Sequence, residues 1–363
     1  MPAAGIISTG NTYRMFDSSV QTHSTLPVGT YSVQFSPLSG FSLQKTEDLI
    51  IGEDKIYGDH GKKIERIIRA YGVTDRSLGV LFTGDKGMGK SLSMRMLAQH
   101  ATDVLGLPVI KVDSNAPGIA EYLDELGEAV VVFDEFEKTF PIRGEDGNAQ
   151  DQFLGLFDGV STTKRMYVIS ANKVDDLSGY LVNRPGRFHY HVRHDYPAPN
   201  EVREYLRDQV PGIDDLEVEE IVTFTRKTQI NFDHLRAIAF ELRLGGAFRD
   251  VVGDINIKRM DTPYYKVFYK FPEQKTQTRV AHLDLFDTEG ISLGITGPKN
   301  TDVDVQFVPT AVSVVGESLT VDLNQAVTRV SPYEFDADKK NEDPAYKPTS
   351  IVLEVLGQNS YTY

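Results

Sequence analysis

The sequence contains no cysteine among its 363 residues. Disulfide bonds, zinc–thiolate sites and thiol chemistry are therefore excluded. No apolar run approaches the roughly 18 residues that a membrane-spanning helix needs. The first residues contain neither the basic segment nor the apolar core of a secretory signal, so we expect none. These absences are compatible with a protein of the reducing cytoplasm, which is the location that we expect.

Positive charge is also scarce, because 38 Lys and Arg residues face 52 Asp and Glu residues, a formal net charge of −14. Non-specific binding to nucleic acid depends on contacts of Lys and Arg with phosphate, so this balance disfavours a general nucleic-acid binder. A local basic channel in a ring stays compatible with it. The length allows two or three domains with real cores.

The most informative segment is a glycine-rich loop of the form G-x-x-x-x-G-K-S at residues 84–91. It follows an apolar run at 79–83, which predicts a buried strand, and precedes good helix formers at 92–98. In this context the pattern indicates a phosphate-binding P-loop. Its glycines let backbone N–H groups turn toward phosphate oxygens, and the helix N-terminus adds partial positive charge. We expect ATP to contact Gly84, Asp85, Lys86, Gly87, Met88, Gly89, Lys90, Ser91 and Leu92.

Within this loop, Lys90 is expected to reach the β- and γ-phosphates, and Ser91 to hold Mg²⁺. A second apolar run, 129–133, ends in Asp134 and Glu135. A wholly apolar strand belongs to a parallel sheet covered on both faces, and such sheets bind ligands at the carboxyl ends of their strands. We therefore expect Asp134 to hold Mg²⁺ and Glu135 to polarise the attacking water. Two acidic residues after a strand are common, but their position about 40 residues after a P-loop favours a hydrolytic site.

A third strand is predicted at 166–170, and it is followed by Asn172, whose amide is placed to position the water. The segment 183–188 then reads N-R-P-G-R-F. Arg184 and Arg187 suit cations that reach a γ-phosphate bound by a neighbouring subunit, where they would stabilise transition-state charge. The alternative is a pair of solvated surface arginines.

Taken in order, these segments resemble the AAA+ ATPases and, within them, the AAA family. Residues 84–91 match the Walker A motif, 130–135 match Walker B, Asn172 matches sensor 1, and Arg184 and Arg187 match the arginine finger. The resemblance covers roughly residues 50–245. It implies an α/β P-loop NTPase (AAA+) fold with a parallel-sheet core and a small helical lid. It also implies ATP and Mg²⁺ as cofactors and a homo-oligomer, expected to be a hexameric ring.

Finer features bear on which AAA proteins this chain resembles and on how its substrate and its catalysis differ from theirs. Residues 153–160 look like the L-L-N-x-L-D-G helix, and the short stretch before Walker B is most like the Bcs-type AAA proteins, which move a folded protein across a membrane. Such a role would need a partner to supply the anchor. Residues 114–122 lack the aromatic-hydrophobic-Gly step of the usual pore loop, so threading of an unfolded chain is not implied. Asp233 stands where other AAA+ groups carry the sensor-2 arginine, which shifts catalysis toward the arginines of the neighbour.

The chain divides into four expected parts: an N-terminal arm with a β-hairpin (1–48), the ATPase core (49–195), the helical lid (196–248) and a β-rich C-terminal domain (249–363). The hairpin is predicted from alternating apolar residues between Tyr31 and Leu43. Residues before Leu26 have little apolar content and are expected to be partly disordered or ordered only against a neighbour. Gly245-Gly246 is expected to end the lid.

Alternating apolar positions at 303–307, 319–323 and 351–355 predict an antiparallel sheet domain or barrel at the C-terminal end. The aromatic run at 264–271 is interpreted as core rather than as a base-stacking platform, because the chain is acidic. Residues 337–348 are expected to form a solvated loop.

His189 and His191 alternate on one face of a predicted strand, a spacing that a metal ion can use. His194 follows close by. A polar strand is the favoured interpretation, because no carboxylate or cysteine completes a ligand set.

Three functions are compatible with these motifs. The first is a ring-forming ATPase that remodels, disassembles or translocates a protein partner. The second is an ATP-driven nucleic-acid machine, such as a helicase loader or a DNA replication or recombination factor. The third is a binding module whose assembly is only switched by nucleotide. The complete set of hydrolytic motifs argues against the third function, and the acidic charge and the AAA pattern favour the first.

Overall fold

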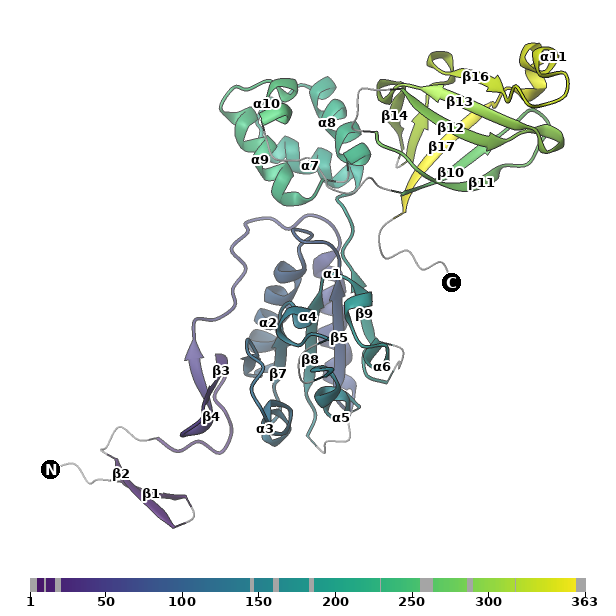
Figure 1. The fold of residues 1–363 in the computed structure, drawn as a ribbon. Coiled ribbons are helices and arrows are strands. Elements are labelled where there is room, and N and C mark those ends of the chain that lie inside the picture. Colours follow the sequence, from purple (N-terminus) through teal and green to yellow (C-terminus); the bar gives the residue numbers. More distant parts are fainter. Residues whose placement is uncertain are drawn as a thin grey trace.

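The computed structural model describes residues 5–9, 11–16, 21–143, 147–158, 163–182, 186–228, 230–254, 264–285, 290–316 and 318–356. Three bodies follow one another along the chain: a sheet covered by helices, a small group of helices, and a β-domain (Figure 1). Among the described residues, no helix combines the length and the apolar character that a bilayer crossing requires.

The first body is built on a seven-stranded sheet with the order β4-β3-β6-β7-β8-β5-β9. Its strands are β3 (Thr30–Ser36), β4 (Gly40–Thr46), β5 (Leu78–Thr83), β6 (Val109–Lys111), β7 (Val130–Phe133), β8 (Met166–Ala171) and β9 (Tyr190–Arg193). Only the β3–β4 pair is antiparallel. Every residue of β5, β7 and β8 is buried, as expected for strands that are covered on both faces.

Helices cover the two faces of this sheet with separate apolar clusters. These helices are α1 (His60–Val73), α2 (Lys90–Leu105), α3 (Ile119–Glu125), α4 (Phe136–Thr139), α5 (Leu154–Phe157) and α6 (Gly179–Val182). α1 and α2 contribute to one cluster, and α3, α4 and α5 contribute to the other. The predicted α/β P-loop fold is therefore confirmed.

The predicted β-hairpin forms, but it is not a separate arm. β3 pairs in parallel with β6, with Thr30 opposite Val109, so the hairpin extends the parallel part of the seven-stranded sheet. The boundary expected at residue 48 therefore falls inside the unit that carries the sheet. Parallel pairing joins distant segments, which local alternation does not reveal. A second hairpin, β1 (Gly5–Thr9) and β2 (Thr12–Phe16), lies in the stretch that was expected to be partly disordered, beyond β4 in Figure 1.

The second body is the helical lid, formed by α7 (Pro199–Gln209), α8 (Asp215–Thr228), α9 (Phe232–Arg243) and α10 (Phe248–Asp254). The expected end at residue 248 is wrong, because Gly245-Gly246 forms a turn and not a terminus. Phe248 is buried in the lid core and its ring lies 5.4 Å from that of Phe224. Packing of α10 against α9 thus continues the lid.

The third body is an antiparallel β-domain, as predicted. Its two sheets share one apolar core and have the orders β11-β10-β17-β15-β14 and β12-β13-β16. The strands are β10 (Tyr264–Lys270), β11 (Gln277–His282), β12 (Ile291–Thr296), β13 (Asp302–Phe307), β14 (Val312–Val315), β15 (Ser318–Val321), β16 (Val327–Val330) and β17 (Ser350–Leu356). Tyr265, Tyr269 and Phe271 are buried in this core, as the aromatic run predicted.

The expected solvated loop at 337–348 is wrong in part. It contains the short helix α11 (Ala337–Glu342) and a following turn that buries Tyr346. Burying the Tyr346 ring against the β-domain core orders a segment whose charged composition suggested a loop.

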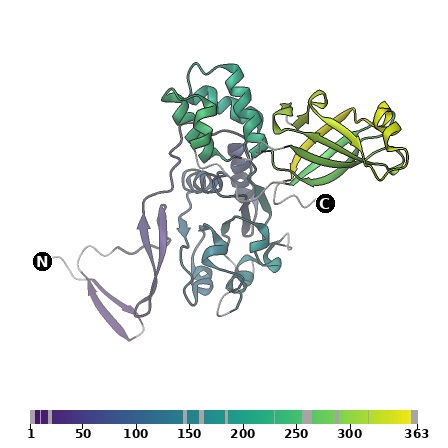
Figure 2. The same ribbon diagram turned by 45° about the horizontal axis from the view of Figure 1, so that its top comes forward.

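The β-domain is attached to the lid through α8, which lies against β14 and β15. The hydroxyl of Tyr265 donates to the carbonyl of Lys227 at 2.8 Å, and Lys227 Nζ donates to the carbonyl of Pro309 at 2.6 Å. The β-domain stays beside the lid helices when the view is turned (Figure 2). These contacts join the β-domain to helix α8 of the lid.

Candidate active site

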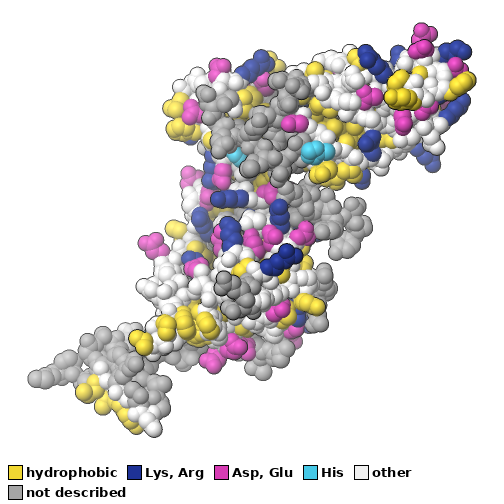
Figure 3. Space-filling model, in the orientation of Figure 1, with side chains coloured by type: hydrophobic (Ala, Val, Ile, Leu, Met, Phe, Trp, Pro, Cys, Tyr) yellow, Lys and Arg dark blue, Asp and Glu magenta, His cyan; other side chains and the backbone are white. Residues whose placement is uncertain are grey.

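A pocket of about 610 Å³ lies between the ATPase sheet and the lid. Its wall consists of 52–57, His60, 86–92, Arg95, Asp134, Glu135, Asn172, Tyr205, Gln209, Phe232, Asp233 and Arg236. Acidic and basic side chains gather on the surface between these two bodies (Figure 3). The structure thus brings three separated sequence motifs and the lid to one place. Gly84 and Asp85, which were also predicted to contact ATP, lie outside the wall of the pocket.

The P-loop follows β5 and leads directly into α2. Gly84, Gly87 and Gly89 have φ angles of 144°, 81° and 89°, which glycine adopts readily and other residues do not. A Cβ atom on Gly84 would also collide with the carbonyl of His194. No side chain caps the first turn of α2, so its N–H groups are available to phosphate oxygens.

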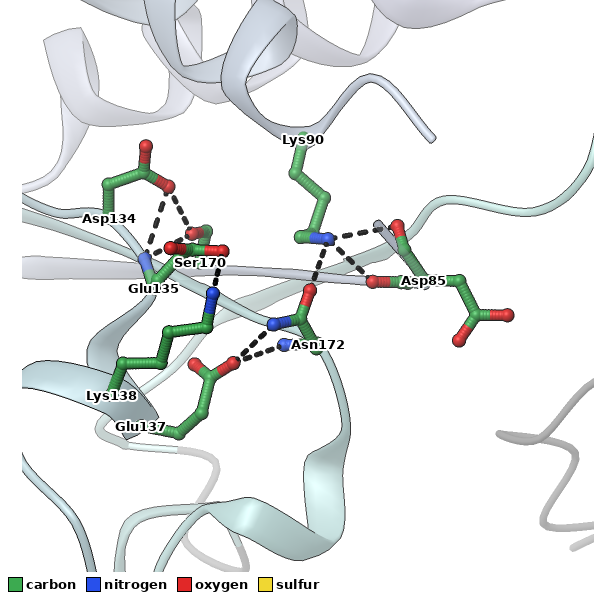
Figure 4. Close-up of polar contacts among 9 residues, drawn as sticks. Asp85, Lys90, Asp134, Glu135, Glu137, Lys138, Ser170 and Asn172 are labelled. Carbon is green, nitrogen blue, oxygen red and sulfur yellow. Dashed lines mark hydrogen bonds and ion pairs between the residues drawn. The ribbon is translucent and has the colours of Figure 1, made fainter. Parts of the chain in front are cut away.

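Lys90 is held at the centre of this loop (Figure 4). Its Nζ donates to the carbonyl oxygens of Gly84 at 2.6 Å and Asp85 at 3.0 Å, and to Asn172 Oδ1 at 3.0 Å. All three acceptors are neutral oxygens. Burial lowers the pKa of Lys90, and nearby carboxylates, Glu137 first, oppose this effect. A buried ammonium group without a hydrogen-bonded anion, beside a helix N-terminus, fits a bound triphosphate.

The end of β7 presents the two Walker B carboxylates. Asp134 Oδ1 accepts hydrogen bonds from Ser170 Oγ at 2.6 Å and from the Glu135 amide at 3.1 Å. Glu135 has a φ of 48°, a left-handed conformation that costs a non-glycine residue free energy. Its amide also donates to Ser170 Oγ at 2.8 Å. Ser170, which was predicted only as a strand residue, therefore holds both carboxylate-bearing residues in place.

The Glu135 side chain points to a cation of its own helix. Glu135 Oε1 lies 2.5 Å from Lys138 Nζ, and both side chains are partly exposed. The hydrogen bond from Lys138 lowers the pKa of Glu135, so this carboxylate is ionised at neutral pH. An ionised carboxylate on the wall of the pocket is the group needed to polarise a water molecule.

Asn172 links the P-loop to the helix that follows Walker B. Its Oδ1 accepts from Lys90, while its backbone amide and Nδ2 donate to Glu137 Oε1 at 3.0 and 2.7 Å. The predicted place of Asn172 beside the Walker B segment thus agrees with the structure. Sequence reasoning missed Glu137, although an acidic residue two positions after Glu135 was visible.

The residues expected to hold Mg²⁺ fit that ion. Ser91 and Asp134 both line the pocket, and hydroxyl and carboxylate oxygens are ligands that Mg²⁺ accepts. When bound, the ion would neutralise negative charge on the phosphates. The aromatic rings of Tyr57, Tyr205 and Phe232 meet on another part of the wall, with Tyr57 and Tyr205 5.1 Å apart, and they give the pocket an apolar surface.

The lid contacts the P-loop directly. Asn231 caps α9 by accepting from the His234 amide at 2.9 Å, and its Nδ2 donates to the Lys86 carbonyl at 3.0 Å. Asp233 lines the pocket. According to the resemblance, it occupies the position at which other AAA+ groups carry the sensor-2 arginine. Arg236, one turn further along α9, also lines it and lies 3.5 Å from Glu53. Arg236 was not predicted as a site residue.

Arg187 does not line this pocket, and its side chain is buried. The guanidinium donates through two nitrogens to the carboxylate of Asp158, one of them at 2.7 Å, and a third nitrogen donates to the Tyr180 carbonyl. The alternative of a solvated surface arginine is therefore wrong for Arg187. Its catalytic role stays a prediction. Arg184 lies outside the described residues.

The histidines near β9 form hydrogen bonds beneath the P-loop. His191 Nε2 lies 2.7 Å from Thr83 Oγ1, and His194 Nε2 lies 2.8 Å from Ser93 Oγ. Burial lowers the pKa of His191 to about 4 and that of His194 to about 3. Within the described part of the chain, no group of three or more His, Asp or Glu side chains is placed to hold a metal ion.

Comparison with known proteins agrees with this geometry. Residues 80–196 match the family described as "ATPase family associated with various cellular activities (AAA)". The human peroxisomal ATPase PEX1 is 26% identical over 248 residues, which is 58% of this chain and 19% of that protein. The peroxisomal ATPases PEX6 of Yarrowia lipolytica and Saccharomyces cerevisiae are each 29% identical, over 135 and 134 residues, which is 32% of this chain and 13% of each protein.

The chain thus spans less than a fifth of the length of these curated relatives. The match nevertheless starts in β5 and ends just beyond β9, so it includes the P-loop, both Walker B carboxylates and Asn172. Residues 80–196 therefore form an AAA ATPase domain.

Proposed function

We propose that this chain is a subunit of a ring that couples ATP hydrolysis to the remodelling of a protein partner. The observation that carries the proposal is the position of the pocket, between the ATPase sheet and the lid. Asn231, at the start of lid helix α9, is hydrogen bonded to the P-loop, and the β-domain is anchored on the adjacent α8. Through these contacts, a change in the bound phosphates would shift the lid, and the lid would move the β-domain with it.

A ring is part of this proposal because Arg187, the described arginine of the finger motif, does not line the pocket of its own chain. Arg187 is engaged by Asp158, so a catalytic role for Arg187 would require that ion pair to open. We assign the contact with the neighbour's γ-phosphate to Arg184, and to Arg187 the task of anchoring the segment. A head-to-tail interface of this kind closes into a ring, and about six subunits is the expected number.

A protein is the proposed partner, and a cytoplasmic setting, where ATP is available, is the proposed location. The net charge of −14 disfavours nucleic acid as the general partner. The proposed likeness to Bcs-type proteins is supported by the short connection between β6 and β7, in which α3 has 7 residues. It would make a folded protein, rather than an unfolded chain, the substrate.

The test uses the Glu135→Gln form, which should bind ATP without turning it over. Mass photometry with and without ATP should show that ATP shifts the chain toward rings, and the Lys90→Ala form should assemble less readily at the same ATP concentration. Crosslinking of the trapped ring in cells then identifies its partner. Persistent monomers with ATP bound would contradict the ring. Strong stimulation of the wild-type ATPase by DNA would instead favour the nucleic-acid machine.

A further inference from the structure

One carboxylate near the pocket has no ion pair with any cation in the described part of the chain, and it belongs to none of the predicted motifs. Glu137 lies on α4, directly after the two Walker B residues (Figure 4). We propose that Glu137 is a positioning residue for ATP hydrolysis, which fixes the amide of Asn172 with its oxygen turned toward Lys90. This inference rests on the ATPase activity of the domain and not on the ring.

The chemistry of the two neighbours of Asn172 allows only one amide orientation. The Lys90 ammonium can only donate hydrogen bonds, and an ionised carboxylate can only accept them. Asn172 Oδ1 must therefore face Lys90, and Nδ2 must face Glu137, as observed at 3.0 and 2.7 Å. A flipped amide would place its NH₂ group against the ammonium and its oxygen against the carboxylate.

The Asn172 backbone amide gives the same carboxylate oxygen a second donor. Glu137 Oε1 accepts this amide at 3.0 Å as well as Nδ2, so it fixes both the end of β8 and the side chain that follows it. The backbone that carries Glu137 is held in place, because Phe136 and Phe140 on either side of it are fully buried. The left-handed backbone of Glu135, fixed by Ser170, sets where α4 begins.

The second oxygen of Glu137 shows that stability alone does not account for this residue. Glu137 Oε2 is buried and has no hydrogen-bond partner within the described residues. A buried carboxylate oxygen without a partner costs free energy of folding. The carboxylate also places negative charge near Lys90, where it counteracts the effect of burial on the ammonium.

A fixed amide oxygen is useful to the reaction. As Lys90 engages the phosphates of ATP, Asn172 Oδ1 becomes available to accept a hydrogen bond from the attacking water. The Glu135 carboxylate accepts a hydrogen bond from the other O–H group of this water. Both acceptors together turn the water's lone pair toward the γ-phosphorus. An amide free to flip would present a donor to that water for part of the time and would lose this alignment.

The experiment compares Glu137→Ala, Glu137→Gln, Asn172→Ala and the Glu137→Ala/Asn172→Ala double variant in full-length protein. Glu137→Ala should lower kcat roughly 10- to 100-fold, within the range of coupling between contacting residues, and should leave the Kd for ATP nearly unchanged. Glu137→Gln should recover most of kcat, because its carbonyl oxygen can accept both hydrogen bonds. The double variant should be no slower than Asn172→Ala alone, since Glu137 acts through Asn172.

Glu125→Gln provides the matched control. This exposed carboxylate ends α3, at the opposite end of the sheet from the lid (Figure 1), and its loss should change neither kcat nor Kd. Wild-type turnover by Glu137→Ala, or fully additive losses in the double variant, would overturn the proposal. If Glu137→Ala does not fold, Glu137→Asp replaces it. That change withdraws the carboxylate by one methylene, and an unchanged kcat would equally overturn the proposal. Absence of wild-type hydrolysis would instead contradict the ATPase assignment.

Discussion

Different side chains in the pocket are placed for ATP binding and for ATP turnover. Lys90 meets only neutral oxygens and is placed for phosphate, whereas Glu135 is ionised and placed for water. Substitution of Lys90 should therefore affect mainly ATP binding, and substitution of Glu135 should affect mainly turnover. Comparing a Lys90 variant with a Glu135 variant therefore separates ATP binding from turnover more clearly than comparing either variant with the wild type.

Glu135→Gln should bind ATP about as tightly as the wild type and lose roughly 10²- to 10⁴-fold in turnover, the usual contribution of a general base. Lys90→Ala should instead weaken ATP binding by about 10- to 100-fold, because it removes a charge-assisted hydrogen bond to phosphate. Equilibrium binding of a fluorescent ATP analogue and a phosphate-release assay measure the two effects. Wild-type hydrolysis by Glu135→Gln would show that the Walker B assignment is wrong.

The buried histidines predict how stability depends on pH. Burial lowers the pKa of His191 to about 4 and that of His194 to about 3, from an ordinary value of 6.5. Between these values the unfolded chain binds more protons than the folded one, so stability falls as pH decreases from about 6.5. Above pH 6.5 both histidines are neutral in either state, and this contribution is fully present.

The melting temperature should therefore fall between about pH 6.5 and pH 4, more steeply than in His191→Gln. Glutamine keeps a polar group near Thr83 and does not titrate. Differential scanning fluorimetry over this range measures both slopes. Equal slopes in the two proteins would show that His191 contributes nothing to acid sensitivity.

At the scale of elements, the site depends on how closely the lid approaches the P-loop. Asn231 both caps α9 and donates to the Lys86 carbonyl. Gly87 has a φ of 81°, and a Cβ atom there would overlap Asn231 Nδ2 and lie 2.8 Å from Asp233 Oδ2. The lid can therefore rest on the loop only because residue 87 has no side chain.

Gly87→Ala should weaken ATP binding, because the added methyl group strains the loop and pushes α9 away. Gly155→Ala, in α5, has open space around its Cβ position and an ordinary φ, so it should be neutral or slightly stabilising. Adding Asn231→Ala to Gly87→Ala should recover part of the affinity by relieving the overlap. Isothermal titration with ATP measures all three proteins, and unchanged affinity in Gly87→Ala would contradict the close contact.

The elements also show what the sequence can reveal about this fold. The P-loop, the Walker B strand and most helices follow from patterns within a few residues, and they were predicted. The pairing of β3 with β6 and the packing of α10 depend on distant partners, so local patterns did not reveal them. The same holds within the site: Ser170 and Glu137 act through contacts with residues about 35 positions away, which spacing alone does not show.

At the scale of the whole molecule, the pocket and the β-domain contact different helices of the lid. α9 faces the pocket, while α8 carries the β-domain through Tyr265 and Lys227. Burial lowers the pKa of Lys227 to about 8, which reflects how tightly this contact excludes water. A lid that closes on ATP would therefore move the β-domain as well. Arg187 does not line the pocket, and it is not among the residues that join the lid to the β-domain.

The two arginines of this segment should respond differently to replacement. Arg187→Ala removes the contact of a buried guanidinium with the carboxylate of Asp158 and should lower the melting temperature markedly, since breaking a buried ion pair costs about 3–5 kcal/mol. Arg184→Ala should leave the melting temperature and ATP binding nearly unchanged and should lower turnover. Thermal melts and phosphate release on the same samples separate the two roles. A full loss of stability in Arg184→Ala would show that both arginines are structural.

Mixing subunits then tests whether the site is completed between neighbours. Each pocket of the proposed ring needs Lys90 from one subunit and Arg184 from the next, so neither Lys90→Ala nor Arg184→Ala rings should be active. In an equal mixture that assembles at random, about one quarter of the interfaces contain both wild-type residues, because each side is intact in half of the cases. Activity should rise toward about a quarter of the wild-type rate if the sites act independently. It should also rise steeply with total protein concentration, as subunits assemble. No recovery on mixing, together with full wild-type activity in dilute monomers, would place the complete site within one chain and leave Arg184 without a catalytic role.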